Sequence, residues 1–85
     1  MPNAEEALTI SVSGTPTQVM ANLHEELTAI VERALHQTNH VGQPPDQWDL
    51  KDQAGTVLDQ HQKVQDLHLA AGATLFLSPK AGIGG

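Results

Sequence analysis

Apolar and polar residues alternate along the first part of the chain. From Leu8 to Val12 every second residue is apolar and the residues between carry hydroxyl groups, a period of two that is typical of a strand with one buried face. Residues 13–16, Ser-Gly-Thr-Pro, have the composition of a turn, and residues 17–22 read as a return strand. The pattern therefore predicts an N-terminal β-hairpin.

The period becomes that of a helix after about Glu25. One stripe with i, i+3, i+4, i+7, i+8 and i+11 spacing contains Leu27, Ile30, Val31, Ala34, Leu35 and Thr38. Glu25 and Glu26 are expected in the first helical turn, where negative charge suits the helix dipole. The segment from Asn39 to Gly42, together with Pro44 and Pro45, ends the helix, because proline cannot continue a helix.

Short strands and turns are predicted beyond the prolines. Residues 47–52 form a strand with Trp48 and Leu50 on its buried face, Gly55 marks a tight turn, and residues 56–58 form a brief partner strand. The parity of Trp48 favours a place in the core over a binding role.

The last part of the chain is predicted to close the core. A short helical turn that contains Val64, Leu67 and Leu69 is expected to cover one end of it. The final strand, residues 73–78, directs its leucines inward and Phe76 outward.

The order hairpin, helix, short strands and final strand predicts an α+β fold. If the last strand lies beside the first, one helix crosses a mixed sheet of four to five strands, which is the β-grasp. We expect one domain over residues 7–79, a flexible leader over residues 1–6 and a flexible tail over residues 80–85.

Composition excludes several classes of function. A chain of 85 residues is too small to enclose a deep catalytic cleft, so we expect a protein that is not an enzyme and has no catalytic residues or cofactor of its own. The net charge of −6 disfavours nucleic acid and anionic membranes as partners. The polar, acidic start and the lack of a long apolar run predict a cytoplasmic protein.

Two histidines have a spacing that occurs in zinc peptidases. His36 and His40 are four residues apart, but Gln37 occupies the place of the catalytic Glu and no third ligand is evident. We therefore predict no metal site. The carboxylates are scattered singly or in adjacent pairs and are expected to form a solvated face.

The chain closes on Gly84 and Gly85 directly after the final strand and a short run from Lys80 to Ile83. Glycine has no Cβ, so a glycine pair can pass through a channel that any side chain would block. The residues from Lys80 to Gly85, at up to about 3.3 Å each, would reach roughly 20 Å beyond the domain. The last carboxylate is therefore the candidate reactive group.

Several motifs resemble ubiquitin in order and approximate spacing: Pro44-Pro45-Asp46-Gln47 after the helix, Ala54-Gly55, Leu58-Asp59, Thr74-Leu75-Phe76-Leu77 and the terminal glycines. The resemblance spans Leu8 to Gly85. The segments from Gly42 to Leu50, from Leu75 to Ser78 and from Ala81 to Gly85 are similar to bacterial ubiquitin-like proteins that are encoded beside activating, conjugating and deubiquitinase-like enzymes.

This resemblance implies a monomeric protein modifier. An activating enzyme would use MgATP to adenylate the Gly85 carboxylate, a catalytic cysteine of a conjugating enzyme would take it as a thioester, and an amine of a target protein would capture the acyl group. A deubiquitinase-like metalloprotease is an implied partner. The gene neighbourhood of bacterial relatives implies a role in antiviral defence.

The chain departs from ubiquitin at positions that contact partners. Ubiquitin has arginines before its glycines, whereas this tail offers Lys80, Ala81 and Ile83, so a dedicated activating enzyme is implied. Ile83 and Gly82 are the candidate partner contacts of the tail. Lys51 and Ser78 interrupt the apolar patch that ubiquitin uses for most of its readers. Phe76 is exposed on the same sheet face by parity and is a candidate partner contact, although single exposed apolar residues are common.

Two other functions share this pattern. A sulfur carrier of the same fold would convert the Gly85 carboxylate into a thiocarboxylate, although such carriers generally lack the Pro44-Pro45-Asp46-Gln47 segment. A non-covalent interaction module would carry the glycines without using them.

Overall fold

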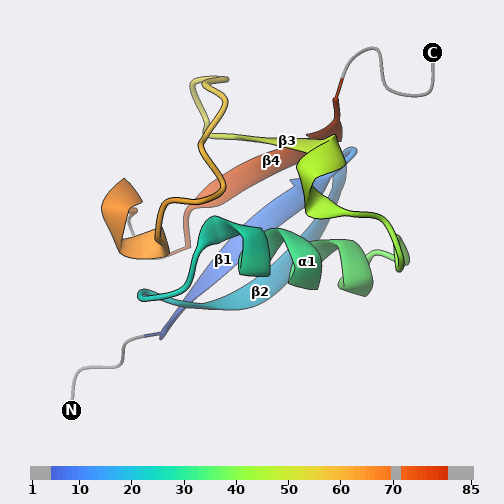
Figure 1. Ribbon diagram of the computed structural model, residues 1–85. Coiled ribbons are helices and arrows are strands. Elements are labelled where there is room, and N and C mark those ends of the chain that lie inside the picture. Colours follow the sequence, from blue (N-terminus) through green and yellow to red (C-terminus); the bar gives the residue numbers. More distant parts are fainter. Residues whose placement is uncertain (1–4, 70–71, 81–85) are drawn as a thin grey trace.

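The computed structural model describes residues 5–69 and 72–80 (Figure 1). Its elements are the strands β1 (Glu5–Val12), β2 (Thr15–Asn22), β3 (Trp48–Lys51) and β4 (Thr74–Pro79), the helix α1 (Leu27–Gln37) and the 3-10 helices η1 (Pro45–Gln47) and η2 (Val64–Leu67). The four strands form one sheet in the order β2-β1-β4-β3. β1 is parallel to β4, whereas the other two pairs are antiparallel. With α1 across one face, this is the predicted β-grasp (Figure 1).

The N-terminal hairpin is confirmed and is longer than its pattern indicates. Ser13 and Gly14, with φ of 48° and 87°, connect the strands. Two left-handed residues give the turn that matches the twist of a hairpin. β1 already begins at Glu5, so Glu5 and Glu6 lie in the sheet rather than in a leader of residues 1–6, because they pair with β2.

The helix is confirmed, but it begins at Leu27 rather than near Glu25, and its first turn contains no acidic residue. The reason is tertiary. The N–H of Leu27 donates to Gln62 O at 2.9 Å and the N–H of Thr28 donates to Gln60 O at 3.0 Å. A distant segment therefore satisfies N–H groups that a helix start leaves unpaired.

The helix ends before the prolines. Thr38, expected on the helical stripe, is the C-cap residue, and its Oγ1 donates to Ala34 O at 2.9 Å. Asn39 follows with a φ of 65°. The helix therefore stops several residues before Pro44, and η1 begins at Pro45.

The core lies between α1 and the sheet and closes at η2. Leu75 and Leu77 point into it, while Phe76 is 43% exposed, as the parity of the strand predicts. Val64 of η2 is buried, which confirms that the short helical turn covers the core. The buried residues are Leu8, Ile10, Val12, Val19, Ala21, Leu27, Ile30, Val31, Ala34, Leu35, Trp48, Leu50, Val64, Leu75 and Leu77.

The brief partner strand predicted at residues 56–58 is wrong. Only an isolated bridge joins Lys51 to Val57, and Leu58 N donates to Leu50 O at 2.7 Å. The chain leaves the edge of β3 after these contacts because the next outward carbonyl, that of Trp48, accepts from the Gln60 side chain instead. Gly55 does form the predicted turn, with a φ of 85°. Among the described helices, none has the length and apolar character needed to cross a membrane.

Candidate functional site

The proposed conjugation tail starts at the end of β4. β4 is held on both sides, by β1 and by β3, and pairing with β3 continues to Pro79. Beyond it, Lys80 N donates to Gln47 O at 3.0 Å. The candidate residues Gly82, Ile83, Gly84 and Gly85 lie outside the described residues. The structure therefore places the base of the tail at Lys80, directly after β4.

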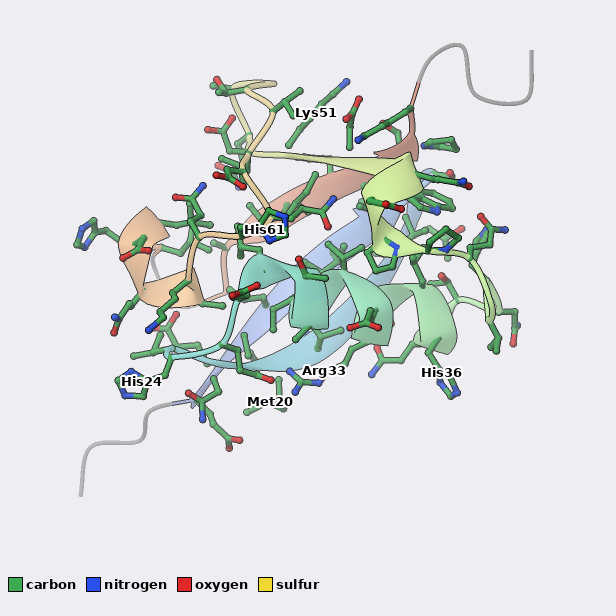
Figure 2. The ribbon with its side chains drawn as sticks, in the orientation of Figure 1. Met20, His24, Arg33, His36, Lys51 and His61 are labelled. Carbon is green, nitrogen blue, oxygen red and sulfur yellow. The ribbon has the colours of Figure 1, made fainter. Side chains whose placement is uncertain are left out.

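The other three candidate residues meet on the open face of the sheet, opposite α1. Phe76 pairs with Lys51 of β3 on one side and with Ser11 of β1 on the other. Ser78 lies two residues further along β4, beside Asp49. Figure 2 shows Lys51 pointing away from α1. The sequence-predicted set thus forms one surface, on which Phe76 is the apolar centre and a lysine and a serine are its neighbours.

Sequence reasoning missed part of this open face. Ser11 pairs with Pro16 of β2, so one row across the sheet consists of Lys51, Phe76, Ser11 and Pro16. Met20 of β2 is 52% exposed, but Figure 2 places it far from Lys51, at the other margin of the molecule. The alternation of β1 predicts that Ser11 faces away from the core. Its position beside Phe76 required the parallel pairing of β1 with β4.

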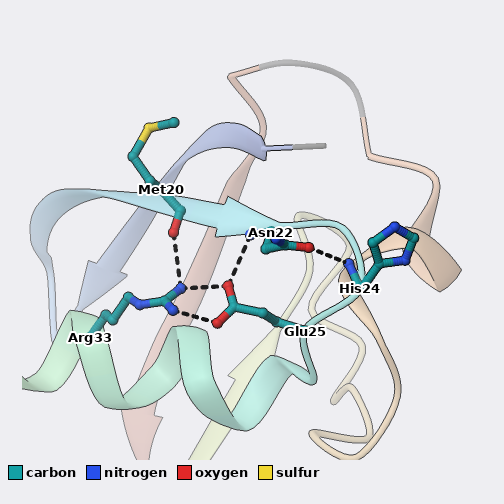
Figure 3. Close-up of polar contacts among 5 residues, drawn as sticks. All are labelled: Met20, Asn22, His24, Glu25 and Arg33. Carbon is teal, nitrogen blue, oxygen red and sulfur yellow. Dashed lines mark hydrogen bonds and ion pairs between the residues drawn. The ribbon is translucent and has the colours of Figure 1, made fainter. Parts of the chain in front are cut away.

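A polar cluster ties α1 to the edge strand β2 (Figure 3). Arg33 and Glu25 form a two-pronged ion pair in which Nη1 donates to Oε1 at 2.7 Å and Nη2 donates to Oε2. Arg33 Nη1 also donates to Met20 O at 3.0 Å, and the Glu25 carboxylate accepts from Asn22 N at 2.9 Å. The hydrogen bond from Arg33 holds the pKa of Glu25 below its ordinary value, and the same bond raises the pKa of Arg33.

This cluster explains why Glu25 does not enter the helix. Its carboxylate lies at the end of β2, where Met20 O and Asn22 N point to the outer edge of the sheet and have no partner strand. Edge strands in sheets expose such groups to further pairing, and proteins commonly cover them with charged side chains. The cluster therefore has a structural role, and nothing in it resembles a catalytic pair.

The histidines are dispersed. His24 and His36 lie at opposite ends of α1 in Figure 2. His40, which sequence spacing placed on the helix with His36, lies beyond the helix end, and its ring packs edge-on against Trp48 at a centroid separation of 5.2 Å. Within residues 5–69 and 72–80, no group of three or more His, Asp or Glu residues could hold a metal ion.

Gln60 is a further residue that the sequence did not single out. Its Nε2 donates to Pro45 O at 3.1 Å and to Trp48 O at 2.9 Å. The backbone carbonyl oxygen of Gln60 accepts hydrogen bonds from both the backbone N–H and the side-chain hydroxyl of Thr28. One glutamine thus joins α1, η1 and the outer edge of β3, and a glutamine in a polar loop gives no sequence signal for such a role.

The topology is that of the ubiquitin-like β-grasp fold, and solved structures agree. An archaeal ubiquitin, from Caldiarchaeum subterraneum, is similar with a TM-score of 0.73 and 18% sequence identity, over 91% of this chain and 95% of that chain. A designed protein based on ubiquitin is similar with a TM-score of 0.78 and 20% identity, over 95% of both chains. At these low sequence identities, the structural similarity shows the fold alone.

Residues 3–85 match the family described as Protein of Unknown function (DUF2604), and the chain belongs to that family. A relative from Sinorhizobium fredii (strain NBRC 101917 / NGR234), Uncharacterized protein y4jI, is 46% identical over 76 residues, which is 89% of this chain. The chain spans 58% of that relative's length.

Proposed function

We propose that this ubiquitin-like protein is a protein modifier that is attached to its targets through the carboxylate of Gly85. The observation that carries the proposal is the β-grasp fold with a glycine pair shortly after its last strand. β4 is fixed between two strands and Lys80 is tied to Gln47, so the tail is based at one defined point of a rigid body. The glycines that follow lack the side chains that would obstruct a narrow active site.

The chemistry would take place on partner enzymes. In the first step, a Gly85 carboxylate oxygen attacks the α-phosphorus of MgATP, and pyrophosphate leaves. A cysteine thiolate then attacks the acyl carbon and displaces AMP, which forms a thioester, and this acyl group passes to the cysteine of a conjugating enzyme. Finally an amine of a target protein attacks the carbonyl, the thiolate leaves and the nitrogen loses a proton. The modifier supplies only the carboxylate and the surfaces that these enzymes bind.

The open sheet face is proposed as the surface for those partners. Phe76 is its apolar centre, and exposed aromatic residues are enriched at protein interfaces. Lys51 and Ser78 would make this surface select different partners from those of ubiquitin. Lys80, Ala81 and Ile83, in place of arginines, support a dedicated activating enzyme, which Ile83 and Gly82 would contact. A metalloprotease that removes the modifier, action as a monomer in the cytoplasm and a place in bacterial antiviral defence are further parts of the proposal.

The decisive experiment is activation in a purified system. The protein is incubated with MgATP and an activating enzyme encoded beside its gene, and the products are an ATP-dependent exchange of pyrophosphate and a thioester that thiols cleave. A protein with one residue added after Gly85 should form neither product, whereas a matched protein with one residue added before Met1 should form both. If the unaltered protein forms neither, the proposal fails.

Two further measurements separate the alternative functions. A sulfur carrier would be recovered from cells with one oxygen of its last carboxylate replaced by sulfur, which intact mass spectrometry detects. A non-covalent module would retain its partners and its cellular activity after deletion of Gly84 and Gly85. A modifier loses both its conjugates and its activity with that deletion.

A further inference from the structure

A groove of ≈ 490 Å³ lies along the outer edge of β3, beside η1 and residues 57–61. One wall is formed by Pro44, Pro45 and Trp48, and the other by residues 57–61, among them Val57 and Leu58. Figure 2 shows His61 of this second wall above α1. The volume is within the range of about 300–1,000 Å³ that ligand-binding clefts occupy in proteins.

The surface of this groove is apolar, and part of it is exposed. Val57 is 55% exposed although its side chain is apolar. The two prolines have rigid rings that lose little freedom on binding. Burial of such a surface by a partner releases water and is favourable in proportion to the apolar area covered.

Hydrogen bonds hold the two walls at a fixed separation. Gln60 Nε2, from one wall, donates to Pro45 O and Trp48 O of the other. Leu58 N donates to Leu50 O at 2.7 Å, and Thr28 Oγ1 donates to Gln60 O at 3.0 Å. The groove is therefore formed before any partner arrives, which reduces the entropy lost on binding.

Acidic residues surround this apolar surface. Asp46, Asp49 and Asp59 all line the groove, and Lys80 is the one lysine that does so. Asp59 Oδ1 accepts from His61 N, but the carboxylates of Asp46 and Asp49 make no hydrogen bond or ion pair with the described part of the chain. The groove thus presents unpaired negative charge next to exposed apolar surface.

We propose that this groove binds a short peptide segment of a partner protein that contains both aliphatic residues and arginine or lysine. The aliphatic side chains fill the space between the prolines and Val57, and the basic side chains pair with the unpaired carboxylates. Since Lys80 also lines the groove, a partner bound here lies beside the base of the tail. Lys51, Phe76 and Ser78 do not line this groove, and the proposal does not depend on conjugation through Gly85.

The test uses three capped peptides of equal length, Arg-Leu-Leu-Arg-Leu-Lys, Glu-Leu-Leu-Glu-Leu-Glu and Arg-Ser-Ser-Arg-Ser-Lys, titrated to about 1 mM, a concentration that detects weak binding. Trp48 is the only tryptophan of the chain and lines the groove, so its fluorescence reports on occupancy. Backbone amide NMR shifts then locate the bound peptide.

The first peptide should bind saturably and shift the amides of residues 44–50 and 57–61, while the other two should not. Asp46→Asn/Asp49→Asn should weaken its binding about three- to tenfold, and 0.5 M salt should weaken it similarly, because exposed charge pairs contribute modestly and are screened. Glu32→Gln, a matched neutralisation outside the groove, should leave the affinity unchanged. Val57→Ser should weaken binding without loss of fold, since Val57 is exposed.

The absence of saturable binding would overturn the proposal. So would equal binding of the acidic peptide, or equal effects of Glu32→Gln and the double aspartate variant. If instead the groove amides shift with protein concentration in the absence of peptide, a second copy of the chain is the occupant, and the proposal is also wrong.

Discussion

Glu25 and Arg33 join the turn after β2 to the middle of α1, and their coupling can be measured directly. We consider the variants Arg33→Met and Glu25→Gln, which keep most of each side chain and remove the charge. The side chain of Arg33 is 43% exposed and that of Glu25 is 25% exposed. Solvent therefore screens the pair, and the full Coulomb energy of a buried ion pair does not apply.

The magnitude follows from the contacts. Exposed ion pairs contribute about 0.2–1 kcal/mol, and two-pronged arginine–carboxylate geometry with additional hydrogen bonds belongs at the upper end of that range. Each single variant should therefore lower the free energy of unfolding by about 1 kcal/mol. The double variant should lose about the same amount and not the sum, which gives a coupling energy of about 1 kcal/mol.

The assay is urea unfolding followed by Trp48 fluorescence, since Trp48 is buried in the core. Glu32→Gln on the same helix is the matched control, because Glu32 is exposed and takes part in no described ion pair. A coupling energy below about 0.3 kcal/mol, within the error of additive sites, would refute the role assigned to the pair. So would a Glu32→Gln variant that loses as much stability as Glu25→Gln.

The same pair gives a signed pH dependence. The pKa of Glu25 is lower in the folded protein than in the unfolded chain, mainly because of the hydrogen bond from Arg33. The unfolded state therefore binds more protons, and the contribution of Glu25 is present above its ordinary pKa and is lost as the pH falls through the folded value. The Glu25→Gln variant should show a smaller loss of stability between neutral and acidic pH than the unaltered protein, and an unchanged profile would contradict the assignment.

Three further predictions use the same unfolding measurement. Gln60→Ala should cost about 1–3 kcal/mol, because Pro45 O and Trp48 O lose their donor, whereas Gln53→Ala at an exposed loop position should be nearly neutral; equal effects would contradict the role of Gln60. Gly55→Ala should cost about 1–2 kcal/mol from backbone strain alone, since φ is 85° and an added Cβ meets nothing within 4 Å, and Gly55→Asn should cost less. Phe76→Ser should change stability by at most about 0.5 kcal/mol, but Leu75→Ala should cost about 2–5 kcal/mol; similar losses would mean that Phe76 is part of the core.

Much of the core could be predicted from the pattern of apolar and polar residues. The alternation of β1 and the helical stripe of α1 identify the buried residues of these two elements, because burial on one face imposes its own period on the sequence. The inward Leu75 and Leu77 and the outward Phe76 follow from the same parity. An end of the helix before Pro44 was also predictable, but the prolines do not set it, because α1 already ends at Gln37 with Thr38 as its C-cap.

The boundaries were less predictable where distant groups decide them. The start of α1 moved to Leu27 because Gln60 and Gln62 supply acceptors for its first N–H groups, and Glu25 was drawn to Arg33 instead. Residues 56–58 have strand-like composition, but the Gln60 side chain occupies the edge of β3 that a strand would need. No local sequence pattern indicates that the Gln60 side chain takes the place of a neighbouring strand at this edge.

By itself the sequence determined the fold, the composition of its core, the outward position of Phe76 and the glycine motif that motivates the proposed conjugation. Each of these depends on local backbone preference or on a repeating contrast between apolar and polar residues. Only the tertiary structure decided that Lys51, Phe76 and Ser11 share one row, that Glu25 and Arg33 cover the edge of β2, and that aspartates line an apolar groove held open by Gln60. These features join residues far apart in the chain, and their partners are chosen by strand order and distance in space, which periodicity does not encode.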